Sequence, residues 1–132
     1  HAGLHNLVRD LNGIYRNNRA MYHFDFDHQG FEWLSCDDVD NSILAFVRSD
    51  GKKSIACVFN FTPATLEDYV LGVPEAGTYQ EIFNSDASWY GGTDVGNGGG
   101  VVSQPQAEHS FENTLSLTIP PLAALFLVKV DD

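Results

Sequence analysis

The hydrophobic pattern of this chain changes its period once, near Met21, and this change limits the fold more than any other feature. After Met21, apolar side chains alternate with polar or smaller ones in short runs that turn residues separate. A period of two is typical of a β-strand with one buried face. The runs predict about eight short strands and a mainly β fold, an antiparallel sandwich or barrel. They cover residues 31–33, 43–48, 55–61, 66–71, 78–83, 101–104, 114–119 and 123–130.

Two turn sequences predict how the first three runs pair. Asp-Gly at positions 50 and 51 joins residues 44–48 to residues 55–61, and it is a strong hairpin signal. A second cluster of turn residues joins the run of Phe31 and Trp33 to the run that starts at Ile43. It consists of Asp37, Asp38, Asp40 and Asn41.

Before Met21 the apolar spacing is three and four, which predicts an amphipathic helix from residue 4 to about residue 18. Its stripe consists of Leu4, Leu7, Val8, Leu11, Ile14 and Tyr15. A β-sandwich covers its own core, so a single helix beside it needs another surface to pack on. We therefore expect the helix to belong to a neighbouring domain. The start at His1, without Met, agrees with a piece of a longer polypeptide.

The composition and net charge of the chain limit the classes of partner that it can bind. The 132 residues suffice for one domain, and 7 basic against 18 acidic residues give a net charge of −11. Such a charge disfavours nucleic acid and anionic membrane surfaces, and no apolar run approaches the roughly 20 residues of a membrane span. Cys36 and Cys57 lie in apolar segments. We interpret them as reduced, buried thiols of a cytoplasmic protein, and nothing supports a disulfide.

No arrangement of residues predicts catalysis, a metal or a cofactor. The glycine-rich residues 91–100 lack the Lys-Ser/Thr of a phosphate loop and lie between predicted strands, so they indicate a flexible or specially folded loop. The acidic cluster at residues 37–40 lacks the glycine and glutamate of a calcium loop, which favours a solvated turn. Asn60-Phe61-Thr62 matches a glycosylation sequon but is better explained as a strand end. The histidines have no zinc-ligand spacing. They are His1, His5, His23, His28 and His109.

The aromatic residues leave alternatives open. Phe31 and Trp33 share one face of a predicted strand, where a partly exposed Trp33 could stack on a sugar ring, or could instead pack in the core or on a missing domain. Trp89 and Tyr90 precede the glycine-rich loop, and their position fits either domain-interface packing or sugar contact. Seven phenylalanines are core candidates: Phe24, Phe26, Phe46, Phe59, Phe61, Phe83 and Phe126.

Several runs, in order along essentially the whole chain, resemble one known family. The first are Val8-Arg9-Asp10-Leu11-Asn12, Tyr15-Arg16, Phe24-Asp25-Phe26-Asp27 and Gly30-Phe31-Glu32-Trp33. Then follow Asn60-Phe61-Thr62-Pro63, Gly72-Val73-Pro74, Glu81-Ile82-Phe83-Asn84-Ser85-Asp86, Tyr90-Gly91-Gly92, Gly96-Asn97-Gly98-Gly99 and the segment from Leu115 to Ala124. This ordered set is similar to the carboxy-terminal end of bacterial 1,4-α-glucan (glycogen) branching enzymes of the α-amylase clan.

The resemblance implies a division of the chain. Residues 1–21 would be the last helix of a truncated (β/α)₈ catalytic barrel, and residues 22–132 the all-β domain that follows it, a Greek-key sandwich. Enzymes of this family are glycosyltransferases of glycogen biosynthesis that cleave α-1,4 links and form α-1,6 branches. Their catalytic carboxylates lie on barrel strands that would precede His1, so this chain alone is expected to be inactive. The implied partners are the catalytic barrel of the same polypeptide and an α-glucan, either glycogen or a malto-oligosaccharide.

The expected contacts follow from the same resemblance and from the aromatic pattern. Expected carbohydrate-binding residues are Trp33, Phe31, Trp89 and Tyr90, with Trp33 first. Expected interdomain contacts are Leu4, Leu7, Val8, Leu11, Tyr15, Gly91 and Gly92. Two alternatives are an independent carbohydrate-binding β-sandwich module and a β-sandwich interaction protein without a role in sugar binding.

Overall fold

The computed structural model describes residues 2–38 and 40–130, and the side chains of Cys36 and Asp37 lie outside the description. It contains one α-helix, α1 (Ala2–Asn17), and three short 3₁₀ turns, η1 (Arg19–Met21), η2 (His28–Gly30) and η3 (Ser88–Tyr90). The strands are β1 (Phe31–Asp38), β2 (Ile43–Ser49), β3 (Ser54–Asn60), β4 (Leu66–Val73), β5 (Thr78–Asn84), β6 (Val101–Val102), β7 (Asn113–Ile119) and β8 (Ala123–Lys129). The predicted helix and the predicted strands are confirmed. The predictions for His1, for Asp37 and for an approach of Cys36 to Cys57 lie outside the described residues.

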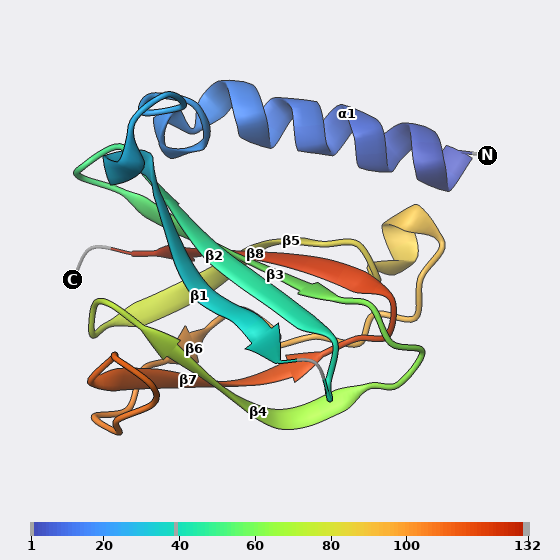
Figure 1. The fold of residues 1–132 in the computed structure, drawn as a ribbon. Coiled ribbons are helices and arrows are strands. Elements are labelled where there is room, and N and C mark those ends of the chain that lie inside the picture. The colour runs from blue at the N-terminus through green and yellow to red at the C-terminus, as the bar shows by residue number, and fades with distance from the viewer. Residues whose placement is uncertain (1, 39, 131–132) are drawn as a thin grey trace.

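The strands form two antiparallel sheets that face each other (Figure 1). One has the order β1-β2-β3-β8-β5-β6, and the other consists of β4 and β7. Both predicted hairpins are present, with Trp33 opposite Phe46 and Phe46 opposite Cys57. The last strand, β8, lies between β3 and β5, so the larger sheet joins segments far apart in the sequence. The sandwich expected from the turn-punctuated runs is therefore confirmed.

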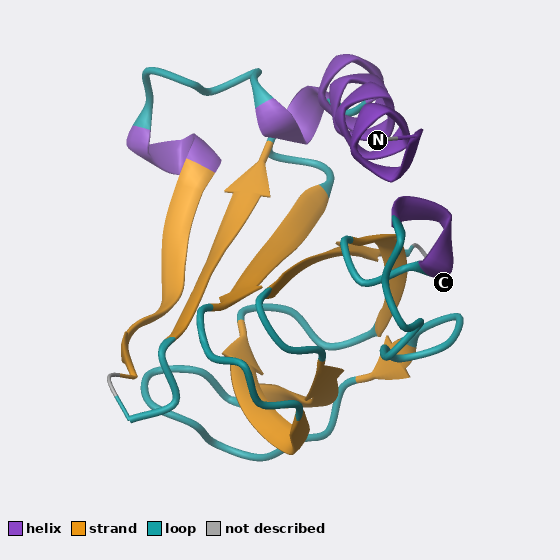
Figure 2. Cartoon of the chain, turned by 90° about the vertical axis from the view of Figure 1, so that its right-hand side faces the viewer, coloured by secondary structure: helices purple, strands orange, loops and turns teal. Residues whose placement is uncertain are grey.

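The inner face of the six-stranded sheet and part of its outer face are covered, by different elements. Its inner face packs on β4 and β7 around residues such as Val58, Leu117 and Leu125. Its outer face carries a second cluster that includes Ile55 and Phe126, and the helix α1 lies above it (Figure 2). Burial on both faces explains why β3 and β8 are continuously apolar rather than alternating.

The phenylalanine predictions are correct only in part. Phe83 and Phe126 are buried. Phe24, Phe46 and Phe59 are partly buried. Phe26 and Phe61 are exposed, so their assignment to the core is wrong. Phe26 lies in the turn before η2, and Phe61 follows the end of β3. Neither position belongs to a strand, so the alternation that buries strand residues does not apply to them.

Cys57 is a free, buried thiol, as predicted. Burial raises its pKa to about 12, so it carries no thiolate at neutral pH. Among the described residues, no helix is both long enough and apolar enough to cross a bilayer.

The glycine-rich loop between β5 and β6 has a specific fold. Asn97 donates to the Thr118 carbonyl oxygen over 2.9 Å and accepts from the Thr118 backbone N–H over 2.8 Å, which ties the loop to β7. The Asp86 carboxylate accepts hydrogen bonds from Thr93 and Val95, which closes the first half of the loop. Of the two alternatives for this segment, the specially folded loop is the correct one.

Gly92 should be intolerant of any side chain. A Cβ atom there would lie 2.1 Å from the Asp86 carbonyl oxygen, whereas a Cβ atom at Gly99 would meet nothing within 4 Å. We expect Gly92→Ala to lower the free energy of unfolding by about 1–3 kcal/mol, because the backbone must move. Gly99→Ala, in the same loop, should leave it unchanged or raise it by about 0.4–1 kcal/mol. Thermal or urea unfolding followed by circular dichroism measures both, and equal stabilities would contradict the packed loop.

Candidate functional site

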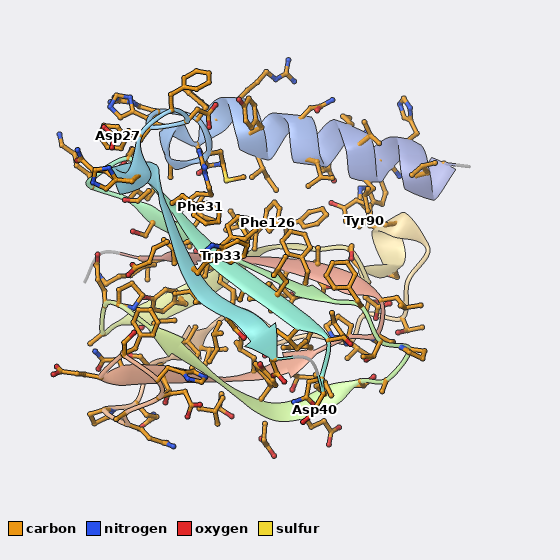
Figure 3. All side chains as sticks on the ribbon, viewed as in Figure 1. Asp27, Phe31, Trp33, Asp40, Tyr90 and Phe126 are labelled. Atoms are coloured by element: carbon orange, nitrogen blue, oxygen red, sulfur yellow. The ribbon has the colours of Figure 1, made fainter. Side chains whose placement is uncertain are left out.

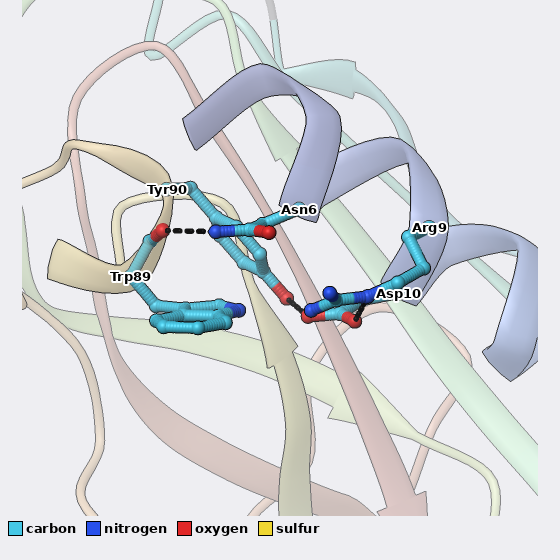
Figure 4. A network of polar contacts seen from close by, with 5 residues as sticks. All are labelled: Asn6, Arg9, Asp10, Trp89 and Tyr90. Carbon is cyan, nitrogen blue, oxygen red and sulfur yellow. Dashed lines mark hydrogen bonds and ion pairs between the residues drawn. The ribbon is translucent and has the colours of Figure 1, made fainter. Parts of the chain in front are cut away.

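A small polar network joins α1 to the turn η3 (Figure 4). The Tyr90 hydroxyl donates to the Asp10 carboxylate over 2.7 Å, and the Asn6 side-chain amide donates to the Trp89 carbonyl oxygen over 3.4 Å. The Arg9 guanidinium pairs with Asp10 at 3.2 Å and lies 5.8 Å from the centre of the Trp89 ring. We call these five residues the helix latch, because they hold one flank of α1 to the β-sandwich.

The latch fixes the charge state of its central pair. The hydrogen bond from Tyr90 lowers the pKa of Asp10, and Arg9 lowers it further. Partial burial, together with the Asp10 carboxylate, raises the pKa of Tyr90 to about 12. At neutral pH the pair is therefore a neutral phenol donating to a carboxylate, which is a strong type of hydrogen bond.

Glycine permits the close approach of α1 to η3. A Cβ atom at Gly3 would lie 2.4 Å from the Tyr90 carbonyl oxygen, so the helix backbone lies directly against the turn. The expected contact glycines, Gly91 and Gly92, have other surroundings. Gly91 ends η3 with a φ of 93°, and Gly92 packs against the Asp86 backbone of its own loop. An interdomain contact at Gly91 and Gly92 stays a prediction, whereas Gly3 and Asp10 are contact residues that the sequence patterns did not indicate.

The apolar stripe of α1 is divided between two environments. Leu7, Leu11 and Ile14 pack on the outer cluster of the six-stranded sheet. Leu4 and Val8 remain 63% and 48% exposed. Val8 is two residues, or about 200°, from Asp10 on the helix, so the exposed apolar flank lies opposite the flank that the latch holds. The helix covers this sheet with one part of its stripe and leaves Leu4 and Val8 exposed.

Aromatic rings continue across the outer face of the sheet beyond the helix. Phe46 stacks on Phe31 with ring centres 5.0 Å apart, and on Phe59 at 5.8 Å. Phe59 stacks in turn on Phe61 at 6.4 Å. Trp33 meets Phe31 edge-on at 5.0 Å and an angle of 87°. We call Phe31, Trp33, Phe46, Phe59 and Phe61 the aromatic row.

The aromatic row is exposed at both ends. Trp33 is 48% exposed and Phe61 is 64% exposed. Leu122, which directly precedes β8 and is not part of the row, is also exposed. Trp33 and Phe31 lie on the sheet face below α1 (Figure 3). Further exposed apolar side chains lie on the free flank of the helix, at Leu4 and Val8, and in the loops that follow β3 and β7, at Phe61 and Leu122, and we refer to these four residues as the apolar corner. Large apolar side chains that are this exposed are typical of an interaction surface.

The remaining polar candidates have structural roles. The Asn60 side chain is buried and donates to the carbonyl oxygens of Ala64 and Pro120, so the sequon asparagine is inaccessible in the folded chain. Asp38 accepts hydrogen bonds from Tyr69 and from Asn41, which orders the turn after β1. Within residues 2–38 and 40–130, no group of three or more potential ligand side chains could hold a metal ion.

Comparison with known proteins identifies the family of this fold. A family model described as "Alpha amylase, C-terminal all-beta domain" matches residues 33–130, and the chain belongs to this family. Among solved structures, the alpha-amylase from H. orenii superposes with a TM-score of 0.54 at 20% sequence identity. The superposition covers 95% of this chain and 20% of the amylase, and it supports the fold.

Two curated relatives are more similar to this chain in sequence than the amylase is. The 1,4-alpha-glucan branching enzyme GlgB of Aromatoleum aromaticum is 48% identical over 134 residues, covering 100% of this chain and 21% of the relative. The GlgB of Cereibacter sphaeroides is 47% identical over 128 residues, covering 96% of this chain and 18% of the relative. The chain thus spans about a fifth of the length of these relatives. The resemblance to the carboxy-terminal domain of branching enzymes is confirmed.

Tyr90→Phe should loosen α1, because it removes the hydroxyl that donates to Asp10. The ordinary pKa of Asp10 is 3.8, and the latch lowers it. The stabilisation is therefore present above pH 3.8 and is lost as the pH falls through the lower folded-state pKa. We expect the α1 amides of the native chain to lose protection from hydrogen exchange as the pH falls below 3.8. Tyr90→Phe should show weaker protection and little of this dependence.

Tyr15→Phe provides the control for this experiment. Tyr15 also lies on α1, but its hydroxyl is 3.5 Å from Asp25 and outside the latch. Protection of α1 in Tyr15→Phe should match that of the native chain. If Tyr90→Phe also matched it, the latch would not hold the helix.

Proposed function

We propose that this chain is the C-terminal domain of a 1,4-α-glucan branching enzyme, and that it packs on the catalytic barrel of the same polypeptide. The proposed parent cleaves α-1,4 links and forms α-1,6 branches in glycogen biosynthesis. The apolar corner is the observation that carries the proposal. Its residues Leu4, Phe61 and Leu122 are each more than 60% exposed, which is costly in water unless another surface covers them.

The rest of a polypeptide as long as the relatives would supply that surface. Because the chain spans about a fifth of their length, the corresponding polypeptide would have ample structure to pack in the corner. The two-sided use of α1 supports the proposed division at residue 21. A terminal barrel helix must contact both the barrel and the domain that follows, and α1 offers an apolar flank to each. An independent carbohydrate-binding module would account for an exposed Trp33 but not for the exposed Leu4 and Val8.

In this proposal the chain contributes no catalytic group. The nucleophile and the acid/base of the reaction would belong to the barrel, and this chain would be inactive alone. Its contribution to the rate would be indirect, because contacts far from the reacting bond increase the rate when they orient the substrate. The parent would act in the cytoplasm, in agreement with the reduced thiol of Cys57.

Trp33 is the preferred site of direct glucan contact. Phe31 and Phe46 brace its ring edge-on, and half of its surface is free for a sugar ring. The other candidates are less suitable. The Arg9 guanidinium lies over the Trp89 ring, and the Tyr90 hydroxyl is engaged by Asp10 while its ring packs on Phe83. Glucans are neutral, so the net charge of −11 does not oppose their binding.

The polypeptide that includes this chain and its upstream coding sequence should branch amylose. We expect a fall in iodine absorbance and new α-1,6 anomeric signals in the proton NMR spectrum. The 132-residue chain alone should produce neither signal. Branching by the isolated chain, or a reading frame that starts immediately before His1, would overturn the proposal.

The same longer polypeptide tests the apolar corner. Val8→Asp should lower its melting temperature by several degrees, because a carboxylate would be placed in an apolar interface. Val102→Asp is the matched control, since Val102 is also exposed but lies on β6, outside the corner. It should leave the melting temperature nearly unchanged.

Trp33→Ala should weaken the binding of maltoheptaose. Loss of an aromatic stacking platform costs about 1–3 kcal/mol where it has been measured in other complexes. Trp89→Ala is the matched control, because Trp89 is similarly exposed and should cost much less. Calorimetric titration of both variants measures the difference. Equal affinities for the native chain and Trp33→Ala would remove Trp33 from the binding site.

A further inference from the structure

The glycine-rich loop contains a chemically reactive dipeptide. Asn97 precedes Gly98, and the sequence has one other Asn-Gly pair, Asn12-Gly13 in α1. In such a pair the backbone nitrogen of the glycine can attack the side-chain amide carbon of the asparagine, because glycine has no side chain to hinder the approach. The reaction needs no enzyme, so the local structure decides which pair reacts.

The reaction at Asn97 is a cyclisation followed by hydrolysis. A bond forms between the Gly98 nitrogen and the Asn97 Cγ atom, and the Cγ–Nδ2 bond breaks. The Gly98 amide proton leaves with the side-chain nitrogen as ammonia. Water then opens the resulting succinimide at one of its two C–N bonds, which leaves either aspartate or isoaspartate. Because ammonia is lost, the step is irreversible.

The folded loop holds the Asn97 side chain by both of its polar atoms. Nδ2 donates to the Thr118 carbonyl oxygen over 2.9 Å and to the Glu81 carboxylate over 3.0 Å. Oδ1 accepts from the Thr118 backbone N–H over 2.8 Å. Cyclisation requires the planar amide carbon to become tetrahedral, and this change breaks the hydrogen bonds. The loop in this conformation, which we call the closed loop, therefore opposes the reaction.

The product would convert these attractive contacts into repulsive ones. An aspartate at position 97 has no Nδ2 donor, so its carboxylate would face the Glu81 carboxylate and the Thr118 carbonyl oxygen at about 3 Å. Like charges at this distance repel, and neither acceptor retains its hydrogen bond from the loop. A loop that opened and reacted could not close on β5 and β7 in the same way again.

We propose that Asn97 is a deamidation site that the closed loop protects, and that each opening of the loop exposes it to irreversible modification. The fraction of modified chains would then record how often the loop has opened. Asn12-Gly13 supplies an internal reference, because Asn12 is exposed on α1 and its protection depends on the helical backbone rather than on this loop.

The rate of deamidation at each Asn-Gly pair tests this proposal. The polypeptide that includes this chain and its upstream coding sequence is incubated at mildly alkaline pH, in native buffer and in concentrated urea, and analysed by peptide mapping with mass spectrometry. In urea, Asn97 and Asn12 should react at similar rates. In native buffer, Asn97 should react at least about tenfold more slowly than in urea, because its rate follows the population of the open loop.

Glycine variants of the same loop separate its opening from global unfolding. Gly92→Ala forces the loop backbone to move, so it should increase the native rate at Asn97 at least threefold and leave the rate at Asn12 unchanged. Gly99→Ala is the matched control, because its Cβ atom would meet nothing within 4 Å, and it should keep the native rate at both pairs.

Asn97→Asp reproduces the aspartate product and tests its effect. It should lower the melting temperature by several degrees, whereas Asn12→Asp should leave it nearly unchanged, since only position 97 faces the Glu81 carboxylate. Equal effects of the two variants would overturn the predicted release of the loop.

The rates can contradict the proposal in three ways. Equal rates at Asn97 in native buffer and in urea would overturn the protection by the closed loop. An Asn97 that stayed unmodified in urea while Asn12 reacted would overturn the site itself. An equal increase at both pairs in Gly92→Ala would identify global unfolding, rather than opening of the loop, as the controlling event.

Discussion

Both faces of the six-stranded sheet carry apolar side chains that must be removed from water, and the rest of the architecture depends on this requirement. The inner face is completed within the chain by β4 and β7. The outer face is completed only over the second cluster, where Leu7, Leu11 and Ile14 of α1 lie on Ile55 and Phe126. The area beyond the helix stays aromatic and open, from Trp33 to Phe61. Trp33 is thus on the part of the outer face that α1 leaves uncovered.

The position of the helix over that sheet follows from features that are remote in the sequence. The Tyr90 hydroxyl reaches the Asp10 carboxylate because the segment after β5 places η3 directly against α1. That loop keeps its shape because Asn97 binds Thr118 and Glu81, and because glycines at tight positions admit neighbouring backbone. The glycine-rich segment, which lacks the signature of any ligand site, therefore follows η3 in one ordered loop, and η3 is the turn that contacts α1.

The sequence predicts the order and type of the elements well, because each depends on local patterns. The stripe from Leu4 to Tyr15 predicts α1, and the Asp-Gly turn predicts the hairpin of β2 and β3. The contacts of α1 could not be predicted in this way. The pairing of Asp10 with Tyr90 spans 80 positions, and the approach of Gly3 to the same turn depends on the final angle of the helix. Likewise, the composition of residues 22–27 gives no indication that Phe26 is exposed, because core and surface phenylalanines are the same residue until the neighbouring elements are placed.

The strand order has a consequence for how the molecule is made. β8 is the last strand in the chain, yet it lies in the interior of the large sheet and supplies Leu125 and Leu127 to the core between the sheets. Until β8 has left the ribosome, the position between β3 and β5 in the large sheet is empty. The core between the two sheets then lacks Leu125 and Leu127. Before β8 emerges, the preceding strands can form only an incomplete intermediate, and its exposed apolar surface makes it prone to aggregation. Folding of this unit therefore depends on the emergence of β8 as well as on the early hairpins.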